Sequence, residues 1–240
     1  MKVTSDKLNT ITEQFVQDIK TLFPDGLVSV CLYGSAVTED FDPDRSNINF
    51  LVALTPEALC DVRKVQPIIK KWQKKRIAMP LFLSELYIEA SLDSFPIEFL
   101  NMQHAYKCLE GKDVLKAIQI DPADLRLQCE RELKGKLLHL RHGYIHSGGK
   151  KRPMLQLISE SLTAFTAIFR ALLVLKGENV PGKKSEILFK TCNVYGHGED
   201  VFRQLVEIRS SGKIGQVELM QVMEAYIQAV EKIGGVVDEM

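Results

Sequence analysis

The stretch YGSAVTEDFDPDRSNINFLVAL, residues 33–54, decides how this chain is read. Its Gly34-Ser35 pair comes directly after LVSVCLY, residues 27–33, a run rich in residues that favour β-strands. A glycine at such a place lets backbone N–H groups approach a phosphate, and a serine hydroxyl adds a further contact. The stretch therefore predicts a phosphate-handling loop at the end of a strand.

The second half of the stretch places two asparagines at the start of another strand. Ser46 precedes the pattern N-I-N and then an apolar run, so we expect a strand over residues 47–54. Side chains two residues apart on a strand point to the same face. Asn47 and Asn49 are therefore expected to point together towards the glycine–serine loop if the two strands are neighbours.

Length and composition restrict the class of protein. The chain has 240 residues, of which 45% are hydrophobic, and its 31 basic and 31 acidic residues cancel. This balance predicts a folded core without an overall basic field for nucleic acid. The five cysteines form no CxxC pair, which predicts reduced thiols in a cytoplasmic protein. Arg170 interrupts the longest apolar run, residues 162–175, so we expect a buried core helix and no membrane span.

The first half of the chain alternates helical and strand patterns. Apolar residues at helical spacing predict a helix ahead of the first strand. Residues 55–57, Thr-Pro-Glu, predict the start of another helix, which Pro67 should interrupt. Residues 80–84 read as a strand, residues 85–93 as a short helix, and residues 95–102 as a further strand.

The pattern changes after about Asp121. Strand signals stop, and helical repeats separated by glycine-rich breaks predict a bundle of four or five helices. We therefore predict an α+β protein, with a small mixed-sheet α/β domain over residues 1–118 and an all-α helical bundle over residues 119–240.

The motif resembles the nucleotidyltransferase superfamily, in particular the DNA polymerase β-like group that includes antibiotic adenylyltransferases and minimal bacterial nucleotidyltransferases. The pattern of that family is Gly-Ser, a variable loop, and Ser-Asp-x-Asp (or Glu) followed by an apolar strand. Gly34, Ser35 and Ser46 match it, and the resemblance implies that they bind the nucleotide. A third carboxylate usually comes from a later strand, for which Glu98 is the candidate. The motifs cover about residues 27–115, and a helical bundle after them is a familiar arrangement.

Asn47 and Asn49 stand where that family has two metal-binding carboxylates. The carboxylates of the family hold two Mg²⁺ ions, which bridge the nucleotide phosphates and the attacking hydroxyl. Asparagine offers only a neutral carbonyl oxygen, which replaces a carboxylate poorly. The resemblance therefore implies Mg²⁺ for an active protein, and otherwise a degenerate site without a cofactor. Whether the asparagine pair is natural or engineered stays open.

Two other sets of residues keep alternatives open. Asp42 and Asp44, in the acidic loop, offer substitute metal ligands beside Glu98, and would then support Mg²⁺-dependent transfer of a nucleoside monophosphate to a hydroxyl. The spacing R-x4-H of Arg141 and His146 resembles the motif of HEPN-type ribonucleases. Residues five apart on an unbroken helix diverge by about 140°, which counts against a single-helix site.

The partners follow from the same residues. The basic stretch of residues 70–76 suits the end of a helix and has no interleaved exposed aromatics, so nucleic acid is not expected. A nucleoside triphosphate at Gly34-Ser35, and a protein partner or second copy through the helical domain, remain the partner classes. The predicted function is a degenerate, catalytically impaired nucleotidyltransferase-like protein that acts by binding a nucleotide or a partner.

Overall fold

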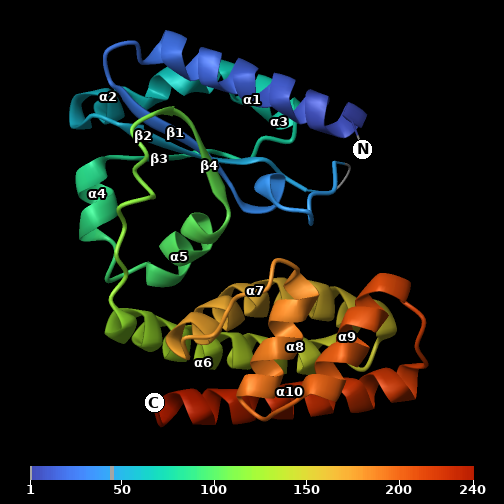
Figure 1. Ribbon diagram of the computed structural model, residues 1–240. Helices are drawn as coiled ribbons and strands as arrows, with labels where there is room; N and C mark the ends of the chain where they lie inside the picture. The colour runs from blue at the N-terminus through green and yellow to red at the C-terminus, as the bar shows by residue number, and fades with distance from the viewer. Residues whose placement is uncertain (1, 44–45) are drawn as a thin grey trace. The chain divides into compact units, whose positions relative to one another are not determined.

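The fold is described from a computed structural model, which places residues 2–43 and 46–240 (Figure 1). The chain divides into two compact units, Met1–Ile120 and Asp121–Met240. All described strands belong to the first unit, and the second unit is built from helices. The predicted α+β class, a mixed-sheet domain followed by a helical region, is confirmed.

Four strands form one mixed sheet within the described part of the chain, in the order β3-β2-β1-β4. The central strand β1 (Leu27–Tyr33) is antiparallel to both β2 (Asn49–Leu54) and β4 (Tyr106–Gly111). The edge strand β3 (Leu81–Leu83) is parallel to β2. The end of β1 and the starts of β2 and β4 therefore meet at one end of the sheet.

One face of the sheet packs against α1 (Lys2–Leu22) and α3 (Ile69–Lys74), which lie on the same side of it in Figure 1. Phe50 of β2 stacks on Phe15 of α1, with ring centroids 3.9 Å apart and planes at 12°. Phe15 also contacts Trp72 of α3 at 4.9 Å. Alternate strand residues and an amphipathic helix thus share one apolar layer.

The other face packs against α4 (Glu85–Ala90) and α5 (Pro96–His104). Leu51 of β2 lies in this layer with Ile88 of α4 and Phe99 of α5, all of them buried. Even-numbered residues of β2 therefore face α1, and odd-numbered residues face α4 and α5.

The strand predicted for residues 95–102 is wrong, because this segment forms the helix α5. Pro96 occupies the first helical turn, where its fixed φ and missing N–H are tolerated. Phe99 and Met102 are then buried three residues apart, on one face of the helix. The fourth strand is β4, which follows α5 and which the sequence pattern did not predict.

The other local signals of the first unit are confirmed. The strand β1 has the predicted bounds, and β2 begins at Asn49, two residues later than expected. Thr55 caps α2 (Pro56–Cys60) by accepting a hydrogen bond from an N–H of the first turn. Pro67 lies in a 3-10 segment, η2 (Val62–Ile68), between α2 and α3, as a proline that interrupts a helix should.

The second unit, whose residues 121–240 are all described, has five helices. Its core holds an aromatic cluster in which neighbouring ring centroids of Phe165, Phe169, Phe202 and Tyr226 lie 5.3 to 5.9 Å apart. The helices are α6 (Pro122–Ser147), α7 (Lys151–Leu175), α8 (Lys184–Val194), α9 (Glu199–Ser211) and α10 (Gln216–Asp238).

Among the residues described, one helix, α7, is long and apolar enough to cross a membrane by length and composition alone. Half of its most apolar window is buried inside the protein. Met154, Ile158, Leu162 and Phe165 of this helix are completely covered by neighbouring residues. We therefore describe α7 as a core helix of the second unit.

Candidate functional site

The Gly34-Ser35 pair lies at the sheet end where β2 and β4 begin. Gly34 opens the short 3-10 turn Gly34–Val37 with a φ of +81°, which glycine adopts without strain. A Cβ atom added to Gly34 would lie 3.2 Å from Nδ2 of Asn49. The missing side chain therefore lets the Asn49 amide lie close to the loop backbone.

The two asparagines precede the apolar part of β2. Asn49 is directly opposite Tyr33 in the sheet, and strand alternation places its side chain on the same face as Leu51. Asn49 is half-buried and Asn47 is exposed. Neither side-chain amide has a hydrogen-bond partner within the part of the chain that the structure describes. Among the described residues, none therefore competes for the Asn49 amide beside the loop.

The loop offers a hydroxyl rather than the glycine N–H to a ligand. The Gly34 N–H already donates a hydrogen bond to the carbonyl oxygen of Ala105, at 2.8 Å. The Thr38 N–H and hydroxyl both donate to the carbonyl oxygen of Ser35, at 3.0 and 3.2 Å, and so fix the turn. The half-buried hydroxyl of Ser35 makes no hydrogen bond to any described residue. It is the group of this pair that a phosphate oxygen can reach.

Ser46 closes the loop that leads into β2. Its N–H donates to the carbonyl oxygen of Asp42 at 2.7 Å, and its hydroxyl accepts from the Asp42 N–H at 3.0 Å. The Ser46 carbonyl accepts from Nε of Arg76 at 3.3 Å. The Ser46 hydroxyl is thus already hydrogen-bonded within the protein. Asp44, the second acid considered as a metal ligand, lies outside the described residues.

The described donors at this end of the sheet do not fit Mg²⁺. Glu98 lies exposed in the first turn of α5, on a helix and not on a strand. The two strands beside β2, β3 (Leu81–Leu83) and β1 (Leu27–Tyr33), carry no carboxylate. Glu110 of β4 forms an ion pair with Lys20 of α1, at 3.0 Å. No group of three His, Cys, Asp or Glu side chains that could hold a metal occurs among the described residues.

Two tyrosines lie opposite each other at the same sheet end. Tyr33 of β1 pairs in register with Tyr106 of β4, and burial raises the pKa of both phenols. The hydroxyl of Tyr106 donates to Oδ2 of Asp113 at 3.1 Å, which adds to the rise and brings its pKa to about 12. Both phenols are therefore protonated near neutral pH.

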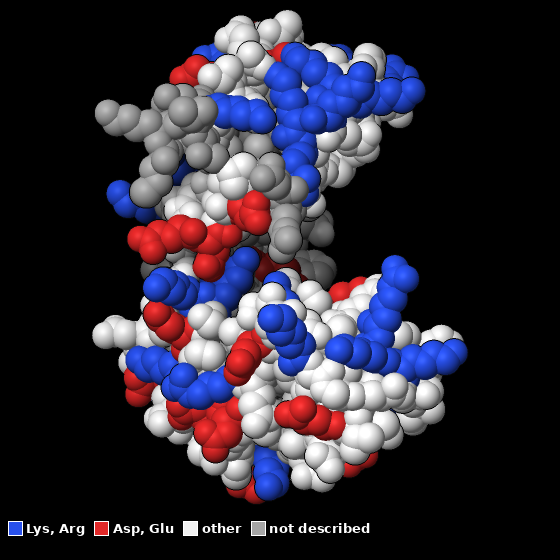
Figure 2. Space-filling view, turned by 90° about the vertical axis from the view of Figure 1, so that its right-hand side faces the viewer, with Lys and Arg blue, Asp and Glu red and all other residues white. Residues whose placement is uncertain are grey.

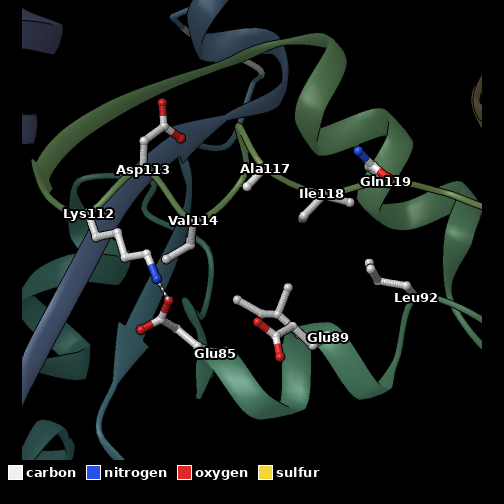
Figure 3. A pocket seen from close by; sticks show the side chains of 10 residues that line it. Glu85, Glu89, Leu92, Lys112, Asp113, Val114, Ala117, Ile118 and Gln119 are labelled. Carbon is white, nitrogen blue, oxygen red and sulfur yellow. Dashed lines mark hydrogen bonds and ion pairs between the residues drawn. The ribbon is translucent and has the colours of Figure 1, made fainter.

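A hollow of about 280 Å³ lies between α4 and the segment that follows β4 (Figure 3). The side chains of Lys112 and Glu85 point towards one another there and form an ion pair. Glu89 and Asp113 also line this hollow, so its charge is mainly acidic. The Lys112 N–H donates a hydrogen bond to the carbonyl oxygen of Val28, which lies at the opposite end of β1 from Gly34. Gly34, Ser35 and Asn49 are not among the residues that line this hollow, and its acidic charge does not suit a phosphate.

The residues of the R-x4-H spacing are not brought together by any contact that the structure describes. Arg141 forms an ion pair with Glu231 of α10, at 2.7 Å. His146 is exposed in the last turn of α6. The arginine thus contacts a carboxylate and not the histidine.

Comparisons with known proteins give a fold but no family. No family model matches the chain, and no curated protein matches it in sequence. Its structure is similar to that of spectinomycin adenyltransferase AAD(9) from Enterococcus faecialis, determined with ATP and spectinomycin. The sequence identity is 10% and the TM-score 0.54, over 96% of this chain and 99% of that chain. The chain therefore shares the fold of a solved adenyltransferase.

Proposed function

We propose that this protein is a catalytically impaired nucleotidyltransferase-like protein, which binds a nucleotide at the Gly34 end of the sheet and acts by that binding. One observation carries the proposal: the amide of Asn49 lies beside Gly34, where the related motif has a metal-binding carboxylate. The fold shared with an adenyltransferase that was solved with ATP supports the nucleotide as the ligand class.

The impairment follows from the charges that the asparagines remove. Two unit charges about 4 Å apart interact by about 4 kcal/mol at an effective dielectric constant of about 20. Replacing Asp by Asn at two ligand positions removes two such attractions to the metal ions, before desolvation is counted. Because about 1.4 kcal/mol corresponds to a factor of ten in rate, we expect turnover to be lower by several orders of magnitude.

The same groups favour binding without a metal. The Asn49 amide can donate hydrogen bonds to phosphate oxygens, and the Ser35 hydroxyl can add another. Without the two carboxylates, the site repels a triphosphate less when no Mg²⁺ is present. We therefore expect nucleotide affinity to be nearly independent of Mg²⁺.

The test is calorimetric titration with ATP and with GTP, each with and without Mg²⁺. We expect the unchanged chain to bind one of them at about micromolar affinity, about −8 kcal/mol, in both conditions. We expect Asn47→Asp/Asn49→Asp to weaken binding without Mg²⁺ through repulsion and to make binding Mg²⁺-dependent. The matched control is Asn9→Asp/Asn179→Asp, which adds the same charge at two exposed positions and should change neither result.

Two outcomes contradict the proposal. Mg²⁺-dependent consumption of a nucleoside triphosphate by the unchanged chain would identify an active nucleotidyltransferase, with Glu98 and a loop acid as the residues to examine. Absence of binding of either nucleotide to the unchanged chain would remove the nucleotide as a ligand and leave a partner-binding role.

A partner-binding role has some support in the second unit. Leu127, Leu138 and Ile145 of α6 are exposed by 58%, 56% and 75%. Their spacing places them within about 20° of one another around the helix axis. Exposed Lys134 lies between them on the same side of the helix, and we propose this partly apolar side of α6 as the surface for a protein partner or a second copy.

A further inference from the structure

A second hollow in the first unit combines an apolar wall with positive charge. It has a volume of about 360 Å³ and lies between the beginning of α1, the end of α3 and the segment that leads into β2. Leu8 and Ile11 of α1 and Phe41 of the loop form the apolar part of its lining. We call it the α1–α3 pocket.

The charged part of the α1–α3 pocket comes from both helices. Lys7 of α1 and Lys74, Lys75 and Arg76 at the end of α3 line it, and no Asp or Glu occurs among its described lining residues. Lys75 donates to the neutral side chain of Gln14. Figure 2 shows Lys and Arg side chains gathered on this side of the first unit. The field in the pocket therefore favours an anion.

Asp18 of α1, four residues after Gln14, is already engaged. It pairs with Lys71 at 2.7 Å and accepts from Nε1 of Trp72 at 3.0 Å. Its charge is thus held by Lys71, which does not line the pocket. The positive charge of the lining is not cancelled by this carboxylate.

The pocket lies on the opposite face of β2 from Asn49. Ile48, which lines it, belongs to the apolar layer under α1, whereas Asn49 shares a face with Leu51 under α4 and α5. Neither Gly34 nor Ser35 lines the pocket. Ser46, the third residue of the motif, does line the pocket, but its hydroxyl already accepts from the Asp42 N–H. The pocket is therefore distinct from the group formed by Gly34, Ser35 and Asn49.

Arg76 occupies a backbone conformation that suits glycine. Its φ is +60°, and it is the one non-glycine residue with positive φ within the described chain. The Ile77 N–H donates to the carbonyl of Trp72 and the Arg76 N–H to that of Gln73, at 3.1 and 3.0 Å, a helix end in which glycine is usual. The left-handed conformation of Arg76 thus closes the end of α3 beside the pocket.

We propose that the α1–α3 pocket binds a small organic phosphate, with a compact apolar body against Leu8, Ile11 and Phe41 and its phosphate against Lys7, Lys74 and Lys75. Ligand pockets of about 300 to 1,000 Å³ are typical for small molecules, and this hollow is at the lower end of that range. The apolar wall behind the cations favours such a molecule over a nucleic-acid strand, whose contacts run along a groove with exposed aromatics.

The probe is 1-naphthyl phosphate, titrated calorimetrically into the full chain at about 150 mM salt, where exposed charges are largely screened. We expect it to bind at least about tenfold tighter than inorganic phosphate, which lacks the apolar body, and than 1-naphthol, which lacks the charge. Ser35→Ala should leave this binding unchanged, because Ser35 belongs to the other site.

The variant Lys74→Ala/Lys75→Ala should weaken binding of the probe at least about tenfold. Lys64→Ala/Lys70→Ala is the matched control, since it removes the same charge from exposed positions of the adjoining segment that do not line the pocket. The control should bind within about twofold of the unchanged chain. Thermal melts by circular dichroism check that both variants are folded.

Four results would overturn the proposal. The first is no measurable binding of the probe. The second is equal affinity for the probe and for inorganic phosphate. The third is an equal loss of binding in Lys74→Ala/Lys75→Ala and in Lys64→Ala/Lys70→Ala. The fourth is tighter binding of a single-stranded RNA 12-mer that is lost in Lys74→Ala/Lys75→Ala, which would identify a nucleic-acid surface.

Discussion

We expect Phe202→Ala to destabilise the second unit by about 4 kcal/mol without changing the unfolding of the first unit. Phe202 is completely buried, and its ring centroid lies 5.3 Å from those of both Phe169 and Tyr226. Truncation of a buried phenylalanine to alanine costs about 3 to 5 kcal/mol, because apolar contacts are lost and a cavity remains. All three rings belong to the second unit.

The assay uses Trp72, the one tryptophan of the chain, which lies in the first unit. It is 2% exposed and donates a hydrogen bond to Asp18, so its fluorescence should report unfolding of that unit. Far-ultraviolet circular dichroism reports the helices of both units. With a urea dependence of about 2 kcal/mol per M, the change should lower the midpoint of the second-unit transition by about 2 M.

Phe50→Ala is the matched change in the first unit. Phe50 is also completely buried and stacks on Phe15 at 3.9 Å. It should shift the fluorescence midpoint and leave the second-unit transition in place. If Phe202→Ala moves the Trp72 fluorescence midpoint as far as the circular dichroism midpoint, the two units unfold as one cooperative block and the reasoning is refuted.

Two further predictions concern the backbone and pH. Arg76→Gly should be more stable than Arg76→Ala by about 0.5 to 1 kcal/mol. Glycine relieves about 1 to 2 kcal/mol of left-handed backbone strain, which exceeds the cost of its greater entropy in the unfolded chain. Equal thermal midpoints of the two variants would contradict this. Burial raises the pKa of Cys129 and of Cys192 from 9.0 to about 12. Their thiols therefore ionise first in the unfolded chain, so stability should be full below pH 9 and fall as the pH rises towards 12. Cys129→Ala should flatten this fall in thermal melts, and an unchanged slope would show that the buried thiol is not its source.

Local signals in the sequence predicted most of the fold. The strand β1 was read from its β-branched and apolar run, and the start of α2 from Thr55 followed by a proline. The strand predicted for residues 95–102 is wrong because an eight-residue apolar segment fits either a strand or a helix. Packing against the sheet decides between them. The strand β4 is short and half-buried, so its pattern is weak.

The candidate site was less accessible to sequence reasoning. The approach of Asn49 to Gly34 follows from strand alternation and neighbouring strands, which the pattern contains. The α1–α3 pocket does not follow from any local pattern, because Lys7 and Lys74 come from distant segments that only the packed sheet brings together. The left-handed backbone of Arg76 likewise has no signal, since glycine is the residue that marks this conformation.

The apolar character of β3 has a consequence for evolution. Asparagine and aspartate codons differ by one base, so Asn47 and Asn49 are each a single mutation from a carboxylate. Leucine and phenylalanine codons are at least two bases from any codon for aspartate or glutamate, and Leu81–Leu83 consists of these residues alone. Two single-base changes could therefore place two acidic side chains at the start of β2, whereas one acid on β3 needs at least two changes within one codon.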